Sequence, residues 1–128
     1  MKQKRRLITG IFSLLLFASL LNLGPKVAEA ATTFVALQTN QSSASTSRIT
    51  TKSSLSYVVN NVGSKPVYFN IFRNGVLHSS GLTVQPGKVI NPGAATVKSG
   101  EYSLRIYCGS REKPQSSGCQ AKGTITGN

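Results

Sequence analysis

Acidic residues are almost absent from this 128-residue chain, which holds three Asp and Glu residues against 15 Lys and Arg residues. None of the three is Asp, and the chain also has no Trp and a single His. Hydrolytic enzymes need paired titratable groups in one site. A Ser-His-Asp triad cannot be assembled from this composition, so the common serine hydrolase mechanism is excluded.

Two other catalytic arrangements can be drawn and are rejected. Glu101 and Glu112 would lie about 23 Å apart along an extended strand, which is too far for a glycosidase pair. A thiol site built from Cys108, His78 and Arg111 would require Cys108 to be unpaired. No glycine-rich phosphate loop leads from a strand into a helix. We therefore expect no enzymatic activity, no nucleotide and no cofactor.

Residues 1–30 have the three parts of a cleaved secretory signal peptide. Basic residues open the chain, an apolar stretch follows over residues 7–23, and Ala28-Glu29-Ala30 places small residues where signal peptidases read. The alternative is a permanent membrane anchor, which needs about 20 apolar residues; Thr9, Gly10 and two serines dilute this stretch. We expect cleavage after Ala30, no transmembrane anchor in the exported chain, and a Gram-positive bacterial source.

The expected mature chain, residues 31–128, is one small domain with a strong positive charge. Its ten Lys and Arg residues and two Glu residues give a formal net charge of +8. Such a charge attracts anionic partners and speeds encounter with them. It also keeps a secreted protein soluble without any partner, so charge alone leaves both interpretations open.

Cys108 and Cys119 are the only cysteines in the chain. Two cysteines in an exported protein normally pair, and this bridge would stabilise the fold by about 3 kcal/mol through loop closure. Two thiols and one His are too few ligands for a closed tetrahedral zinc site. The cysteines therefore predict a disulfide and no metal site.

Apolar residues alternate with polar ones at period two, which indicates β-strands. Asn74-Gly75 is a strong hairpin signal. In the C-terminal third, Tyr102 to Cys108 and Cys119 to Ile125 alternate in the same way. If Cys108 lies opposite Cys119 in one hairpin, every apolar pair falls on one face, so this register is our prediction.

About seven short strands separated by turn signals predict a small antiparallel β-sandwich with a C-terminal disulfide-linked hairpin. Gly100-Glu101-Tyr102 is similar to the start of the tyrosine corner in immunoglobulin-like and fibronectin-like domains. This resemblance implies their sandwich architecture for residues 31–128 and implies no function.

One face of the expected sandwich collects aromatic and basic side chains. We predict that the strand ending at Arg73 lies beside the strand beginning at Tyr102, as in immunoglobulin-like sandwiches. The candidate binding residues are then Tyr68, Phe72, Arg105, Tyr107, Arg111, Lys113 and Lys122, with Asn70 beside them. Aromatic rings stack on sugars and Arg pairs with phosphate. Alternatively, the rings are covered by another strand, since cross-strand aromatic pairs also stabilise sheets.

These features favour a secreted, non-enzymatic binding module associated with the cell wall. The expected partner is an anionic, teichoic-acid-like envelope polymer or glycan, or else an extracellular protein. The alternative is a secreted antimicrobial protein or an inhibitor of an extracellular enzyme that uses the disulfide-clamped loop 109–118 as a rigid insertion loop.

Overall fold

The computed structural model describes residues 30–128; the expected signal peptide therefore lies outside the described residues, apart from Ala30. The described part of the chain consists of strands and connections without a helix. The strands are β1 (Ala31–Leu37), β2 (Ser43–Ser45), β3 (Ile49–Thr51), β4 (Ser54–Asn61), β5 (Val67–Arg73), β6 (Val76–Val84), β7 (Val89–Ile90), β8 (Ala95–Thr96), β9 (Gly100–Cys108) and β10 (Ala121–Gly127). From Ala30 onward, no helix is long and apolar enough to cross a membrane.

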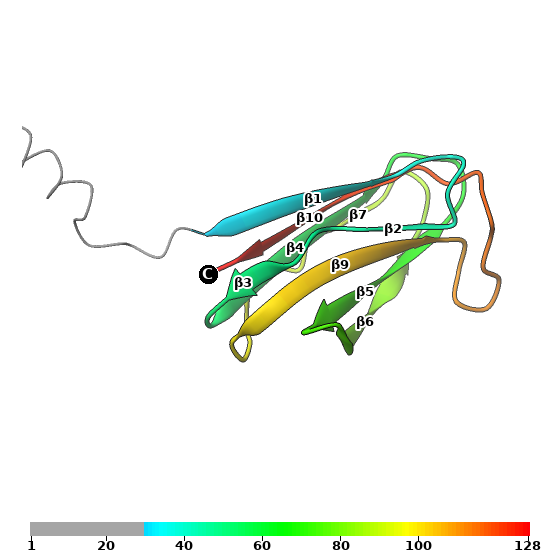
Figure 1. Ribbon diagram of the computed structural model, residues 1–128. Helices are drawn as coiled ribbons and strands as arrows, with labels where there is room; N and C mark the ends of the chain where they lie inside the picture. The colour runs from blue at the N-terminus through cyan, green and yellow to red at the C-terminus, as the bar shows by residue number, and fades with distance from the viewer. Residues whose placement is uncertain (1–29) are drawn as a thin grey trace, which may run out of the picture.

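The strands form two antiparallel sheets that pack face to face (Figure 1). Sheet A has the order β1-β10-β4-β7, with β8 also pairing with β4. Sheet B has the order β2-β9-β5-β6, with β3 also pairing with β9. The all-β antiparallel sandwich predicted from the sequence is confirmed.

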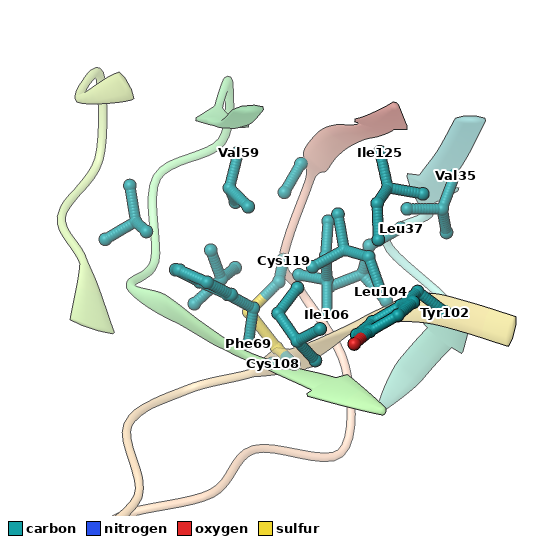
Figure 2. Packing of buried hydrophobic residues seen from close by; sticks show 14 of the residues in the cluster. Val35, Leu37, Val59, Phe69, Tyr102, Leu104, Ile106, Cys108, Cys119 and Ile125 are labelled. Carbon is teal, nitrogen blue, oxygen red and sulfur yellow. A yellow bond between two sulfur atoms is a disulfide. The ribbon is translucent and has the colours of Figure 1, made fainter. Parts of the chain in front are cut away.

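Alternation along the strands builds a single core between the sheets. In β9, Tyr102, Leu104 and Ile106 are fully buried. They face Val59 and Ile125 of sheet A, which are fully buried as well (Figure 2). Each buried side chain of this size stabilises the folded state by about 1.5–3 kcal/mol relative to leaving it exposed. The core therefore explains the apolar residues at the inward-facing positions of the strands. The outward-facing residues do not take part in it.

Cys108 and Cys119 form the predicted disulfide, with a Cα–Cα distance of 5.4 Å. The predicted hairpin around it is wrong. The strand β9 pairs with β5, β2 and β3 in sheet B, whereas β10 pairs with β1 and β4 in sheet A. The bridge therefore ties the two sheets together at one end of the sandwich (Figure 2).

The hairpin prediction failed because period-two alternation does not distinguish neighbours within a sheet from partners across the core. Either arrangement puts the apolar residues of both strands on a shared interior. Gly123 shows which one occurs: a Cβ there would lie 2.8 Å from Leu104 Cδ2 and 2.9 Å from Ile106 Cδ1. These two strands therefore meet face to face, at a distance that only glycine permits.

Two local predictions are confirmed. Asn74 and Gly75 both adopt positive φ, 52° and 81°, and join β5 to β6, as expected for a type I′ turn. The Tyr102 hydroxyl donates a hydrogen bond of 2.7 Å to the carbonyl of Lys98. This bond reproduces the tyrosine-corner contact, in which the hydroxyl reaches backbone a few residues upstream.

Candidate functional site

The candidate site is the outer face of sheet B, over the paired strands β5 and β9. Their register places Tyr68 opposite Tyr107, Asn70 opposite Arg105, and Phe72 opposite Ser103. These residues alternate with the buried core residues of both strands. The prediction that the two strands are neighbours is confirmed, and three successive pairs face away from the core.

The Tyr68 and Tyr107 rings are stacked, with centroids 4.8 Å apart and an interplanar angle of 7°. The guanidinium carbon of Arg111 lies 5.0 Å from the Tyr68 ring centroid, and that of Arg105 lies 5.5 Å from the Tyr107 ring centroid. Both distances are within cation–π range. We call these four residues the tyrosine platform: two rings stacked in parallel, each with a guanidinium group over it.

Arg111 reaches the platform from the disulfide-clamped loop. Its Nη2 atom donates to the carbonyls of Phe69 (3.0 Å) and Gly81 (2.9 Å) and to Asn70 Oδ1 (2.6 Å). The two carbonyls belong to β5 and β6, where a bulge interrupts their pairing. Arg111 therefore fastens the loop to sheet B at the point where the regular ladder leaves backbone acceptors free.

The loop itself is braced from within. Gly109 pairs with Pro114, Ser110 N donates to the Lys113 carbonyl (3.2 Å), and Lys113 N donates to Ser110 Oγ (3.1 Å). Gln115 N donates to the Cys108 carbonyl (3.0 Å). These contacts form a tight turn that carries Arg111 toward the sheet.

Two hollows flank the tyrosine platform along β5 and β9. One, of about 300 Å³, lies beyond the start of β5 and the end of β9, and its lining includes Pro66, Gly109, Lys65 and Lys113. The other, of about 310 Å³, lies toward the opposite end of the face. Its lining comprises Ser45, Thr46, Ser47, Arg48, Phe72, Gly75, Ser103 and Arg105. We call this second one the arginine hollow.

The structure brings together most, but not all, of the predicted binding residues. Tyr68, Phe72, Arg105 and Tyr107 share the outer face of sheet B, and Arg111 joins them from the loop. Lys113 lies beyond the end of this face, in the first hollow.

Lys122 was misplaced. It lies in β10, opposite Ala36 of β1, and is exposed on the outer face of sheet A. The error follows from the false hairpin, which would have put β10 beside β9. The neighbours of Lys122 in a shallow hollow of about 290 Å³ include Phe34, whose side chain is 72% exposed.

Sequence reasoning missed Arg48 and the serines that precede it. The Ser-rich segment after Asn40 contains β2, which pairs with β9. Arg105 Nη2 donates to Ser43 Oγ (2.9 Å) across that pairing. The alternation of small and polar residues in Ser43-Ala44-Ser45 was the available signal, but three residues are too few for a period to be recognised.

No family model matches this sequence, and no curated protein matches it. Among solved structures, the chain is similar to a family 35 carbohydrate-binding module from Clostridium thermocellum (10% identity, TM-score 0.45, covering 76% of this chain and 90% of that one). It is also similar to PirA (9%, 0.45, 80% and 97%). A third similarity is to the exo-β-1,3-galactanase of Phanerochaete chrysosporium with galactose (14%, 0.36, 79% and 27%). Similarity at these scores carries no conclusion about function.

Proposed function

We propose that the exported protein is a non-enzymatic binding module that holds an anionic glycan polymer of the cell envelope on the outer face of sheet B. The observation that carries this proposal is the tyrosine platform. Each ring already contacts its partner ring and has a guanidinium group over it. The parts of the rings that remain accessible supply apolar contact area for the C–H groups of a sugar, and guanidinium groups pair with anionic substituents beside it.

The tyrosine platform is more elaborate than the stability of the sheet requires. Cross-strand aromatic pairs contribute about 0.2–1 kcal/mol relative to Ala–Ala, which accounts for two stacked rings. The position of Arg111 is explained by its hydrogen bonds to β5 and β6. Arg105, which is exposed and hydrogen-bonded to Ser43 Oγ, is the cation that remains for a ligand. The expected net charge of +8 adds long-range attraction toward an anionic polymer.

Export is part of the proposal and rests on two supports. The sequence of residues 1–30 predicts a signal peptide, and β1 begins at Ala31, the residue that would follow the expected cleavage. The Cys108–Cys119 disulfide fits an oxidising compartment outside the cell. Retention at the cell wall would then come from charge and from the tyrosine platform.

The alternative, an inhibitor or antimicrobial protein acting through loop 109–118, has one observation in its favour, the internal bracing of the loop. The contacts of Arg111 weigh against it. This side chain is exposed but is hydrogen-bonded back onto sheet B, whereas no such bond holds the other exposed charges of the described turn, Glu112 and Lys113. An insertion loop would be expected to present its largest side chain outward.

The test compares two outward-facing aromatic residues on opposite sheets, the half-buried Tyr68 and the exposed Phe34. Binding of the exported protein to immobilised teichoic acid and to polygalacturonate is measured for the wild type, Tyr68→Ala and Phe34→Ala. Loss of the contact with an aromatic side chain costs about 1 kcal/mol, so Tyr68→Ala is expected to weaken binding about fivefold and Phe34→Ala to leave it unchanged. Equal effects of the two variants, or no binding by the wild type to either polymer, would contradict the proposal.

A further inference from the structure

The arginine hollow is built from two different parts of the chain. The outer side chains of β5 and β9, Phe72 and Ser103, stand opposite each other in register. The last residue of β2, Ser45, and the segment joining β2 to β3, with Ser47 and Arg48, also contribute to the lining. That segment is held in place by Thr46, whose amide donates to the Leu104 carbonyl (2.9 Å) and whose Oγ1 accepts from Leu104 N (3.0 Å). The hollow therefore has a fixed wall.

Two guanidinium groups line the arginine hollow, and one carboxylate lies near it. Glu101 Oε2 is 3.7 Å from Arg48 Nη1, and both side chains are 54% exposed. An exposed pair at this distance contributes about 0–1 kcal/mol, so an incoming anion can compete for Arg48. Within residues 30–128, Arg105 has no carboxylate partner; it donates to Ser43 Oγ instead. The charge of the hollow is therefore available to a ligand.

The remaining lining suits a polar ring that carries a negative charge. Ser45 Oγ donates to the Thr46 carbonyl (3.1 Å), and Ser47 Oγ is 2.8 Å from Thr33 Oγ1. A hydroxyl has one donor and two acceptor positions, so each keeps capacity for a further bond. The Phe72 ring supplies an apolar surface in the same lining. The volume of about 310 Å³ is near the lower limit for small-molecule sites, about 300 Å³, and corresponds to a single substituted ring.

We propose that the arginine hollow binds the anionic substituent of a glycan, a carboxylate or a phosphate, and that it thereby selects acidic over neutral polymers. This inference rests on the proposed function, because it places a second contact of the same ligand on the same face. Guanidinium groups suit this role since their planar donor fork matches both anions.

The spacing along the face sets the size of the ligand. Tyr68 and Phe72 are four residues apart in β5, which corresponds to about 13 Å at 3.3 Å per residue. One sugar ring cannot contact both Tyr68 and Phe72, although Arg105 belongs to both the tyrosine platform and the arginine hollow. The ligand that fills both is therefore an oligomer with its charge displaced from the ring that stacks on the tyrosines.

The test compares one polysaccharide in a charged form and in a neutral form. Binding of the exported protein to polygalacturonate and to its fully methyl-esterified form is compared for wild type, Arg48→Gln and Arg73→Gln. Arg73 lies at the same end of β5, but its guanidinium donates to the Ser99 carbonyl through Nε (3.1 Å) and Nη2 (2.6 Å), and Arg73 does not line the hollow. The variant Arg73→Gln therefore removes the same formal charge as Arg48→Gln and serves as the matched control.

The wild type is expected to prefer the free acid, and Arg48→Gln to reduce that preference about fivefold while Arg73→Gln keeps it. Glucosylated poly(glycerol phosphate) in a parallel assay shows whether phosphate is accepted as well as carboxylate. An unchanged preference in Arg48→Gln, or equal reductions in both variants, overturns the inference. A reduction by Arg48→Gln with no effect of Tyr68→Ala would uphold the arginine hollow and refute the tyrosine platform.

Discussion

The two sheets bury the same kind of residue and expose different kinds. On their inner faces, both carry Val, Leu and Ile at alternate positions. Outward, β4 and β10 of sheet A display Ser56, Val58, Asn60, Thr124 and Thr126, with Lys122 as their single cation. The outward positions of β5 and β9 instead display two tyrosines, a phenylalanine and an arginine. Sheet A also exposes one aromatic residue, Phe34 of β1. Several aromatic and basic side chains gather on the paired strands of sheet B, and this cluster calls for a functional explanation.

The largest expected effect is the loss of stability when the disulfide between the two sheets is removed. The double variant Cys108→Ser and Cys119→Ser should lower the free energy of unfolding by about 3 kcal/mol, measured by urea denaturation. It should also loosen loop 109–118 and with it the position of Arg111. Polymer binding by sheet B should therefore weaken in the same variant. An unchanged unfolding midpoint would mean that the sheets hold together without the bridge.

The next effect compares inward and outward positions on one strand. Gly123→Val places a side chain against Leu104 and Ile106 across the core and against Val35 of the neighbouring strand β1. It should destabilise the fold by about 1–3 kcal/mol. Thr124→Val, one residue further along and opposite Phe34, should change stability by less than about 0.5 kcal/mol. Thermal unfolding of both variants measures the difference. Similar melting temperatures would show that the sheets can separate locally.

A third pair of variants contrasts the outer faces directly. Arg105→Glu reverses a charge beside Tyr107 and should weaken binding to acidic polymer about tenfold, equivalent to about 1.4 kcal/mol. Lys122→Glu makes the same change in net charge on sheet A and should weaken binding about twofold through long-range attraction alone. Both are measured by titration at physiological salt, where charges are screened beyond about 8 Å. Equal losses would show that only diffuse charge matters.

The smallest expected effect concerns the fastening of the loop. Arg111→Gln removes the hydrogen bonds to the carbonyls of Phe69 and Gly81 and should cost about 1 kcal/mol of stability. Lys113→Gln, two residues later in the same turn, changes a side chain without such contacts and should cost almost nothing. Hydrogen exchange at the amides of loop 109–118 provides the measurement. Faster exchange in both variants to the same degree would contradict the special role of Arg111.

The sequence predicted those parts of the fold whose signals are local. Alternation predicted the strands and their inward faces, Asn74-Gly75 predicted the hairpin turn, and Tyr102 predicted the corner contact. The pairing of β5 with β9 was also predicted correctly, by resemblance to sandwich domains. With that pairing, Tyr68, Phe72, Arg105 and Tyr107 could be placed on one face before the structure was known.

The sequence could not predict which strands share a sheet at the C-terminal end. A disulfide with its Cα atoms 5.4 Å apart fits both a hairpin and a bridge across the core. The choice depends on the competition between β1, β4 and β9 for the edges of β10, which is a property of the whole fold. The contribution of Arg48 was hidden for a similar reason, because its position depends on a three-residue strand and on the backbone contacts of Thr46.

The first and last strands of the described domain also determine how it would respond to a pulling force. Ala31 pairs with Gly127 and Leu37 with Ala121, so both ends of the folded part leave the sandwich from the same side (Figure 1). Tension applied between these ends would peel β1 from β10 one residue pair at a time instead of shearing the whole ladder at once. Strands pulled apart in this way separate at a low unfolding force. The opposite end of the sandwich, where the disulfide and the tyrosine platform lie, would be the last to open.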